Sequence, residues 1–321
     1  MKTIALGRTG LEVSRVAFGT WQLSGDWGAF DEDEAVAAIR RARELGITLF
    51  DTAQAYGFGA SERLLGTALR SELDRDRDSV VIATKGGIRP PDRDASEAFL
   101  RQGVEESLRH LGVETIDIYQ VHWPDPDVPA AETAGALQRM VDEGKIRFAG
   151  VSNYDARQME EFAAVRPVDV LQPPYHLLRR GIEDEILPFA RAHDIGVLAY
   201  SPLGSGLLTG RVDERTRFDD DDWRSQASAF TGAGLERNLA VVRGLDELAR
   251  ERGITLGQLA IAWVLAQPGV HVAIVGARSA ANIEASAGAA DVELTPEDLA
   301  RIEEIAAEGV QVEGATPEGV L

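Results

Sequence analysis

Eight short apolar runs alternate with amphipathic segments along the 321 residues of the chain, and this alternation narrows the folds open to it. One strand-like run ends just before Trp21. The other seven lie at 47–51, 80–85, 115–122, 146–152, 168–174, 195–201 and 271–277. The segments with helical spacing lie at 31–46, 61–73, 96–112, 155–165, 182–194 and 255–267. Such alternation favours an α/β fold with a closed parallel barrel, the (β/α)8 TIM barrel. A doubly wound sheet is the structural rival, but the Gly-rich dinucleotide fingerprint that it would need after an early strand does not appear.

The segments outside this alternation carry expectations of their own. A β-hairpin is expected around residues 7–10, and Ser61 is expected to be the N-cap of the helix that follows it. Residues 204–235 form a long polar stretch, with the run DERTRFDDDDWRSQ, that suits either a lid or a solvated loop. We expect a single barrel domain over 1–321, with 309–321 as a flexible tail because it is rich in Gly and polar residues.

The charge of the chain argues against several classes of partner. Its 53 acidic and 33 basic residues give a formal net charge of −20, which repels phosphate backbones and anionic membrane surfaces. We therefore expect neither nucleic acid nor a membrane as partner. No run approaches the roughly 20 apolar residues that span a bilayer. Cysteine is absent, which removes disulfide and thiolate chemistry and is compatible with the cytoplasm, where we expect the protein.

Four polar residues, Asp51, Tyr56, Lys85 and His122, lie where apolar strand-like runs stop, in TLFDTAQAYG, VVIATKGG and IYQVHWPD. In a barrel of alternating strands and helices, the strand ends gather on one face, so residues far apart in the chain can meet around one substrate. Such a set can carry out proton chemistry on a carbonyl group.

Tyr56 is the candidate proton donor in this set. Reduction of a carbonyl by hydride transfer makes an alkoxide, and a free tyrosine with a pKa near ~10 is a poor donor at neutral pH. A neighbouring ammonium lowers the pKa of a phenol, and Lys85 would supply that charge. Asp51 would pair with Lys85 and offset its desolvation. His122 could donate a hydrogen bond to the substrate oxygen and orient it.

Each of these residues also has an ordinary structural interpretation. Asp51 could cap a turn, Tyr56 could be a rim aromatic, and Lys85 could be solvated beside its two glycines. A lone His122 is more often structural than catalytic. A metal-dependent barrel hydrolase with His122 and Asp51 as ligands is a further alternative, but the five histidines are dispersed without ligand spacing, and we expect no metal.

The segments FDTAQAYGFGASERLLGTAL, IATKGG, DIYQVHWPD and GVSNY resemble the aldo-keto reductase superfamily. The likeness runs from LGRTGLEVSRVAFGTWQ to AIVGARSAANIEAS, in the family's order and with similar spacing. It implies an eight-stranded barrel whose bottom is closed by an N-terminal hairpin, and which binds a nicotinamide dinucleotide without a Rossmann motif. The family's catalytic tetrad falls on the same four residues, with Tyr56 as general acid and base.

The resemblance also implies a set of cofactor contacts. Ser152, Asn153 and Gln172 match the residues at the nicotinamide carboxamide, and Tyr200 matches the aromatic residue that stacks on the nicotinamide ring. The remaining matches are Ser201, Leu203, Gly204 and Gly206 along the pyrophosphate, then Gly276, Arg278, Ser279 and Asn282 in the adenosine segment.

The adenosine segment bears on the choice of cofactor. Arg278, with Ser279, could bind a 2′-phosphate because a guanidinium engages phosphate oxygens in pairs, which favours NADPH over NADH. Asn282, Ala285 and Ser286 depart from the Arg or Gln, Glu and Asn of many relatives. This departure predicts fewer adenine contacts and leaves the use of NADH possible.

Trp21 and Trp123, with Tyr56, are expected to form an aromatic wall around a small carbonyl substrate. Further aromatic candidates for this wall are Trp27, Phe58 and Trp223. The expected protein is a monomer or weak homo-oligomer that reduces an aldehyde or ketone with NADPH, or runs the reverse oxidation. The alternative is an NADPH-binding regulatory subunit with incidental turnover, as in the potassium channel beta subunits of the same superfamily.

Overall fold

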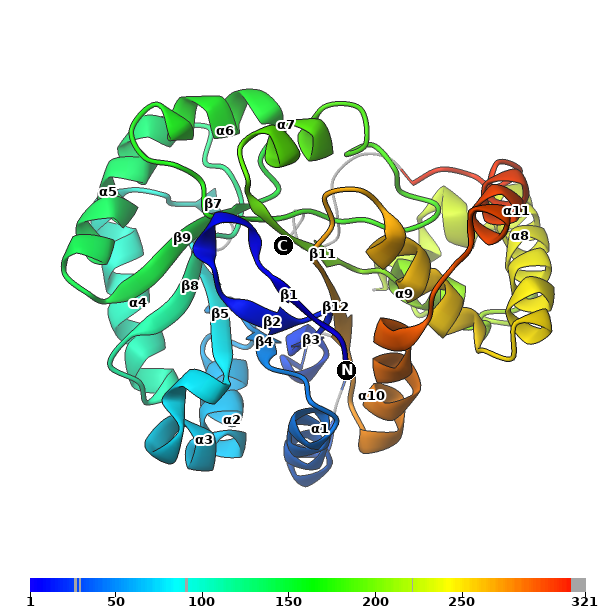
Figure 1. Cartoon of the computed structure of the whole chain (residues 1–321), viewed down its shortest axis with the longest axis horizontal. Coiled ribbons are helices and arrows are strands. Elements are labelled where there is room, and N and C mark those ends of the chain that lie inside the picture. Colours follow the sequence, from blue (N-terminus) through cyan, green and yellow to red (C-terminus); the bar gives the residue numbers. More distant parts are fainter. Residues whose placement is uncertain (26–27, 29, 90–91, 221, 313–321) are drawn as a thin grey trace.

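The eight apolar runs form one closed parallel barrel surrounded by helices (Figure 1). The computed structural model describes residues 1–25, 28, 30–89, 92–220 and 222–312. The barrel strands are β3 (Val16–Gly19), β4 (Leu49–Asp51), β5 (Val81–Gly86), β8 (Ile116–Val121), β9 (Ile146–Ser152), β10 (Val170–Gln172), β11 (Gly196–Tyr200) and β12 (Val272–Gly276). Each pairs in parallel with its neighbour, and β12 pairs with β3 to close the ring. The expected (β/α)8 barrel is confirmed, and the doubly wound sheet is excluded.

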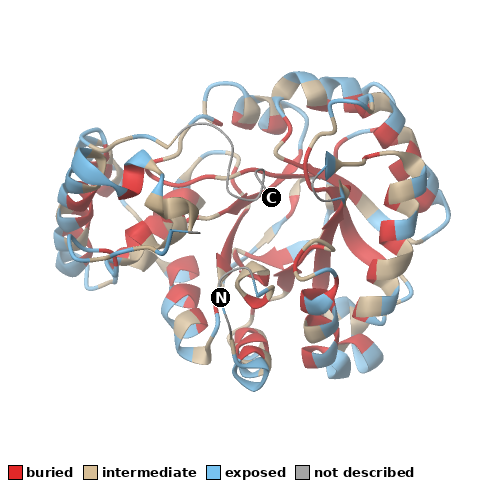
Figure 2. Cartoon of the chain, turned by 180° about the vertical axis from the view of Figure 1, so that it is seen from behind, coloured by how far each residue is buried: buried red, intermediate tan, exposed pale blue. Residues whose placement is uncertain are grey.

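Helices fill the connections between these strands and turn their apolar faces inward (Figure 2). They are α1 (Glu32–Glu44), α2 (Ala60–Ala68), α3 (Arg70–Arg75), α4 (Glu97–Leu111), α5 (Ala130–Asp142), α6 (Ala156–Ala163), α7 (Ile186–Ala192), α8 (Gly232–Glu251), α9 (Leu256–Ala266), α10 (Ala280–Ala287) and α11 (Pro296–Ala306). Side-chain caps explain several starts: Asp155 and Thr255 each form a capping box with the glutamine three residues later. Helix α5 was missed in the sequence because it follows Pro129 without a side-chain cap.

The expected N-cap role of Ser61 is wrong. Helix α2 begins one residue earlier, after Gly59, whose φ of 89° makes a left-handed turn that suits glycine. Ser61 therefore lies inside the helix, where its buried hydroxyl donates toward the carbonyl oxygens of Thr20 and Leu23 at 3.4 and 3.2 Å. The hydroxyl ties the helix to the turn after β3 instead of capping the helix.

The N-terminal hairpin closes the lower end of the barrel. Strand β1 (Thr3–Ala5) pairs antiparallel with β2 (Glu12–Ser14), and a short turn η1 (Gly7–Thr9) joins them. Leu6 and Val13 are fully buried and belong to the apolar cluster that fills the barrel interior. This filling leaves the upper end, at the carboxyl ends of the strands, for polar side chains.

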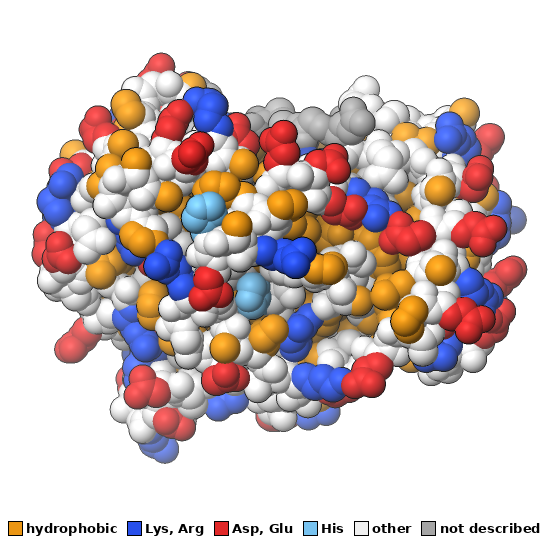
Figure 3. All heavy atoms as spheres, turned by 45° about the horizontal axis from the view of Figure 1, so that its top comes forward, with side chains coloured by type: hydrophobic (Ala, Val, Ile, Leu, Met, Phe, Trp, Pro, Cys, Tyr) orange, Lys and Arg blue, Asp and Glu red, His pale blue; other side chains and the backbone are white. Residues whose placement is uncertain are grey.

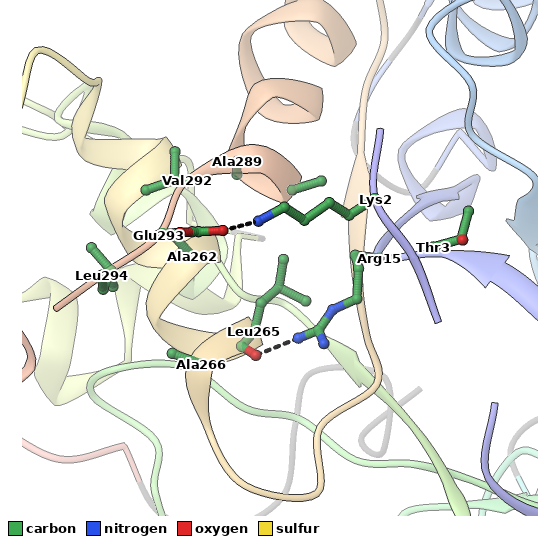
Figure 4. Close-up of a pocket in the computed structure, with 11 residues that line it drawn as sticks. Lys2, Thr3, Arg15, Ala262, Leu265, Ala266, Ala289, Val292, Glu293 and Leu294 are labelled. Atoms are coloured by element: carbon green, nitrogen blue, oxygen red, sulfur yellow. Dashed lines mark hydrogen bonds and ion pairs between the residues drawn. The ribbon is translucent and has the colours of Figure 1, made fainter. Parts of the chain in front are cut away.

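A cavity of about 420 Å³ lies beside this hairpin, between the end of α9 and the segment after α10 (Figure 4). Lys2 forms an ion pair with Glu293 at 2.5 Å, and Arg15 donates a hydrogen bond to the carbonyl of Leu265. Arg15 directly precedes β3, so this cavity is at the end of the barrel opposite to the strand ends that carry the four polar residues. It is separate from the expected active site.

Buried apolar residues anchor the polar segment 204–235. It contains the short helical turns η4 (Gly204–Thr209), η5 (Trp223–Ser225) and η6 (Ser228–Phe230) before α8 begins. Leu207 and Leu208 are buried, and the rings of Trp223 and Phe230 pack edge to face with centroids 5.5 Å apart. The lid interpretation of this segment stays a prediction.

The chain end is hydrogen bonded as far as the structure describes it. The backbone N–H of Val310 donates to Asn238 Oδ1 at 2.8 Å, and that of Val312 donates to the Leu178 carbonyl at 2.6 Å. Residues 313–321 lie outside the described residues, so the expectation of a flexible tail over 309–321 stays a prediction.

Acidic and basic side chains are interspersed over the face of the molecule that Figure 3 shows. Among the described residues, no helix is long and apolar enough to cross a membrane.

Gly86 gives room to a buried tyrosine behind β5. A Cβ atom at Gly86 would lie 1.9 Å from Tyr119 Oη and 2.9 Å from its Cζ, and Tyr119 is fully buried. We expect Gly86→Ala to lower the free energy of unfolding by about 1–3 kcal/mol through overpacking. Thermal unfolding measures this loss. Gly181→Ala, whose Cβ meets nothing within 4 Å, is the matched control.

Removal of the tyrosine hydroxyl should relieve the Gly86→Ala clash. Tyr119 Oη has no hydrogen-bond partner among the described residues, so Tyr119→Phe removes the clashing atom without breaking a described bond. The double variant is expected to melt above Gly86→Ala. Equal melting temperatures for the two would contradict the assignment of the clash.

Candidate active site

The four polar residues meet at the upper end of the barrel. Asp51 ends β4, Lys85 lies near the end of β5, and His122 directly follows β8. Side chains alternate along a strand, and Leu49 and Ala83 belong to the interior cluster, so Asp51 and Lys85, two residues further on, also point inward. Tyr56 reaches the same place from the turn after β4, and its side chain is nearly buried.

Lys85 is the centre of the hydrogen-bond network. Its Nζ donates to Asp51 Oδ2 at 2.7 Å, to the Thr52 carbonyl at 3.0 Å and to Tyr56 Oη at 3.3 Å. An ammonium has three hydrogens and no acceptor, so these three acceptors satisfy it fully. Because Tyr56 Oη accepts from Lys85, its own hydroxyl hydrogen is directed away from the Lys85 nitrogen.

Lys85 and Asp51 are both buried, so each charge needs the other as its partner. The side chain of Lys85 is 0% exposed and that of Asp51 is 3% exposed. A buried charge is tolerated only when it is paired and hydrogen bonded. The pair therefore keeps a positive charge next to the Tyr56 phenol in a region with little water to screen it.

Aromatic side chains surround Tyr56. The rings of Trp21 and Tyr56 are stacked with centroids 6.3 Å apart, and His122 meets the Tyr56 ring edge to face at 5.7 Å. Trp123 is 9% exposed, and the guanidinium of Arg93 lies 4.8 Å from its ring centroid. The structure thus brings Trp21 and His122 to the Tyr56 ring, and the described ring contact of Trp123 is with Arg93.

The three further aromatic candidates do not all join this wall. Phe58 is 65% exposed, and Trp223 packs against Phe230 in the segment 204–235. Trp27 lies outside the described residues. The aromatic wall that the structure describes around the phenol therefore consists of side chains from the ends of the barrel strands.

The residues expected at a nicotinamide carboxamide form one hydrogen-bonded group. Ser152 Oγ donates to the Gln172 carbonyl at 2.8 Å, and Asn153 Nδ2 donates to Ser152 Oγ and to the His122 carbonyl, both at 3.0 Å. Tyr200 Oη donates to Asn153 Oδ1 at 2.8 Å. These contacts place the Tyr200 ring beside the amide group.

The two groups are joined by one side chain. Gln172 Nε2 donates to Asp51 Oδ1 at 2.8 Å, so the amide expected at the cofactor also holds the carboxylate of the ion pair. The sequence did not predict this contact, because it depends on the register that places the end of β10 across the barrel from β4.

The loop after β11 has a left-handed backbone at four residues. Ser201, Gly204, Ser205 and Gly206 have φ values of 57°, 54°, 52° and 97°, and the N–H groups of Gly204 and Gly206 donate to the Ser201 and Leu203 carbonyls. Leu203 lies within this series. Among the described residues, a Cβ at Gly206 would meet only Arg224 Nη1, at 3.9 Å.

His176 supports this loop from beneath. Burial, with a smaller contribution from the Arg179 guanidinium, lowers the pKa of the His176 imidazole to about 3. The ring is therefore neutral at physiological pH, and its Nδ1 accepts a hydrogen bond from the Leu178 N–H at 3.2 Å. A Cβ on Gly204 would lie 3.4 Å from that nitrogen, so the ring and the loop are in close contact.

The adenosine candidates lie at the start of α10. Gly276 ends β12, Arg278 is exposed, and Ser279 is the N-cap of α10 without a side-chain cap bond. Asn282 Oδ1 accepts from Arg211 Nη2 at 3.3 Å. The segment 204–235 therefore reaches the same surface as α10.

Sequence reasoning missed two arginines in that segment. Arg211 contacts Asn282. The guanidinium of Arg224 donates three hydrogen bonds to the Asp222 carboxylate, and its Nη1 donates to the Ser205 carbonyl at 3.3 Å. Both basic residues lie in a stretch that was treated as one polar loop. That stretch has no periodicity, so no signal in the sequence singles these two arginines out.

The fold and this arrangement of side chains define an aldo-keto reductase. The chain belongs to the Aldo/keto reductase family, whose model matches residues 15–307. Members of this family are oxidoreductases that act on small carbonyl compounds with nicotinamide cofactors. The resemblance drawn from the sequence is confirmed.

Two curated relatives and two solved structures are similar to this chain over most of its length. The chain is 42% identical to the aldo-keto reductase YhdN of Bacillus subtilis (89% of this chain, 87% of the relative) and 35% identical to probable aldo-keto reductase 1 of Glycine max (94% and 88%). The glycerol dehydrogenase AKR11B4 from Gluconobacter oxydans superposes with a TM-score of 0.89 at 39% identity, over 98% of both chains. The aldo-keto reductase AKR11C1 from Bacillus halodurans, in its holo form, has a TM-score of 0.80 at 27% identity, over 97% of this chain and 98% of that one.

Proposed function

We propose that the chain transfers a hydride between NADPH and an aldehyde or ketone, with Tyr56 as general acid and base. The observation that carries the proposal is the set of three acceptors around Lys85 Nζ, with Tyr56 Oη as one of them. In this geometry Tyr56 Oη accepts from Lys85, so the phenolic hydrogen is not shared with Lys85, and a buried positive charge lies beside the phenolate that would remain after proton transfer.

Each tetrad residue has one task in this proposal. Reduced nicotinamide supplies the hydride when the cofactor is bound. Tyr56 gives its proton to the oxygen of the forming alkoxide, and Lys85 stabilises the resulting phenolate. Asp51 keeps Lys85 charged and in place, and His122 orients the substrate oxygen from the other side of the phenol. In the reverse oxidation, the phenolate of Tyr56 takes the proton of the alcohol.

The residues present fit a nicotinamide dinucleotide. Ser152, Asn153 and Gln172 offer hydroxyl and amide groups that match the donors and acceptors of a carboxamide, and Tyr200 offers a ring face beside them. The left-handed loop at 201–206 contains two glycines, which would let a pyrophosphate approach the backbone closely. These groups would hold the nicotinamide ring beside Tyr56. The substrate could then approach the ring from one direction only.

The adenosine end favours NADPH. Arg278 and Ser279 lie at the start of α10, where a phosphate meets a cation and the helix N-terminus, and Arg211 lies close by on Asn282. Ala285 offers no polar group, so few contacts to the adenine base are expected. The 2′-phosphate therefore contributes most of the discrimination, and NADH remains a weaker cofactor.

Arg278→Gln is expected to raise KM for NADPH by roughly tenfold or more, since hydrogen bonds to a charged group are worth about 1.5–3 kcal/mol. KM for NADH, which lacks the phosphate, should stay unchanged. Steady-state kinetics with both cofactors at a saturating carbonyl substrate measures the two constants. An equal rise in both would show that Arg278 does not read the phosphate.

The test of the function itself begins with tryptophan fluorescence titrations of the protein with NADPH and NADH. Consumption of NADPH is then followed with a panel of aldehydes and ketones. The panel includes glyceraldehyde and dihydroxyacetone, because one solved relative is a glycerol dehydrogenase. Turnover with at least one carbonyl compound supports the proposal. Tight NADPH binding without turnover on any of them would overturn it in favour of a regulatory role.

A further inference from the structure

A layer of polar side chains crosses the barrel directly above its apolar filling. Asp51 and Lys85 belong to this layer, together with Gln120 of β8 and Gln172 of β10. Gln120 is 0% exposed and pairs in register with Lys85 on one side and Gly150 on the other. Ile118, two residues earlier on the same strand, lies in the interior cluster, so Gln120 also points inward. It has no part in the tetrad or among the cofactor candidates.

The two glutamines and Asp51 form a chain of hydrogen bonds. Gln172 Nε2 lies 2.8 Å from Asp51 Oδ1 and 3.4 Å from Gln120 Oε1. An ionised carboxylate only accepts hydrogen bonds, so the Gln172 atom facing Asp51 must be the amide nitrogen. Both of its hydrogens are then used, one on the carboxylate and one on Gln120. The orientation of the Gln172 amide is thereby fixed.

Packing on β9 holds Gln120 in this position. A Cβ at Gly150 would lie 2.9 Å from Gln120 Cγ and 2.7 Å from the Val170 carbonyl. Only glycine therefore leaves room at this point for the Gln120 side chain between β8 and β10. Gln120 Nε2 is buried and has no partner among the described residues. Gln120 therefore contacts Gln172 through its side-chain carbonyl oxygen.

We propose that Gln120 and Gln172 are positioning residues that hold the Asp51 carboxylate and, through Lys85, determine how readily Tyr56 releases its proton. The inference rests on the proposed function for its role in turnover. The carboxylate divides its hydrogen bonds, with Oδ2 facing Lys85 and Oδ1 facing Gln172. Without the donor on Oδ1, Asp51 would neutralise Lys85 more completely, and the phenolate of Tyr56 would lose part of its stabilisation.

The test measures the ionisation of Tyr56 directly, without cofactor or carbonyl. Tyrosinate absorbance is recorded against pH for each protein with and without Tyr56→Phe, and the difference isolates Tyr56 among the five tyrosines. Burial raises the pKa of Tyr119, Tyr154 and Tyr175, so these three stay protonated over the range of interest. The tyrosinate absorbance in this pH range therefore comes from few of the tyrosines.

Gln172→Met is expected to move the Tyr56 midpoint upward by roughly 1 pH unit, and Gln120→Met to move it by less in the same direction. The double variant should match Gln172→Met alone, because Gln120 acts only through Gln172. Gln267→Met is the matched control, since it loses a hydrogen bond to the Trp263 carbonyl at the far end of α9. It should leave the midpoint unchanged.

Two results would overturn the inference. One is an unchanged Tyr56 midpoint in Gln120→Met while its melting temperature falls, which is the behaviour of an ordinary core residue. The other is additive shifts in the double variant. Neither depends on turnover, so a wild-type protein that fails to reduce carbonyls would count against the proposed function alone. In an active protein, the pH profile of kcat should shift together with the Tyr56 midpoint.

Discussion

Tyr56→Phe is expected to lower kcat for carbonyl reduction by about 100- to 10,000-fold, the range typical of general acid catalysis. The substitution removes only the hydroxyl that accepts from Lys85 Nζ at 3.3 Å and that would protonate the substrate oxygen. The ring, with its contacts to Trp21 and His122, remains. The loss should therefore appear in the chemical step and not in the binding of the cofactor.

Steady-state and single-turnover kinetics on one validated carbonyl substrate measure this loss. The dissociation constant for NADPH, from fluorescence titration, serves as the control and should stay near the wild-type value. Turnover of the variant at a rate close to wild type would remove Tyr56 from the role of proton donor.

Lys85→Met is the second substitution with a large expected effect, because it acts on both activity and stability. It removes the charge that would stabilise the Tyr56 phenolate, and it leaves the Asp51 carboxylate buried without its ion-pair partner. The loss of one partner of a buried ion pair typically costs about 3–5 kcal/mol. We expect a clear fall in melting temperature together with a loss of turnover.

Asp51→Asn in the Lys85→Met background separates these two effects. The double variant replaces the buried pair with neutral groups and should regain much of the lost stability, as replacement of buried ion pairs often does. Its turnover should stay low because the charge beside Tyr56 is still missing. Recovery of turnover along with stability would show that Lys85 has only a structural role.

The barrel could be predicted from the sequence because its strands are buried on both faces. Runs such as 80–85 and 146–152 are mostly apolar, and β5 and β9 occupy nearly the same residues. The ends of these runs also indicated where polar side chains would gather. Asp51 and Lys85 could be placed together because the carboxyl ends of parallel strands share one face of a barrel.

Details that depend on the backbone or on register could not be predicted in this way. The Thr52 carbonyl that completes the bonding of Lys85 carries no signature in the side-chain pattern. Gly59 makes the turn that starts α2, and the serine two positions later misled the choice of N-cap. The contact between Gln172 and Asp51 depends on how far one strand is shifted against another.

The surface near the start of α10 could not be predicted from the sequence for a different reason. Arg211 and Arg224 lie in a polar segment without periodicity, where no local pattern tells which side chain turns back to the barrel. The structure places Arg211 on Asn282 and Arg224 on the Ser205 carbonyl. Such contacts join segments far apart in the chain, and only the folded arrangement reveals them.

The most direct test of the account follows a label from cofactor to product. The protein is loaded with NADPH that carries deuterium at both positions of C4 of the nicotinamide ring and is given a carbonyl substrate in ordinary water. The account predicts an alcohol with one deuterium on the former carbonyl carbon, formed in equal amount to the cofactor oxidised. An unlabelled alcohol, or oxidation of NADPH without any alcohol, would contradict hydride transfer at this site.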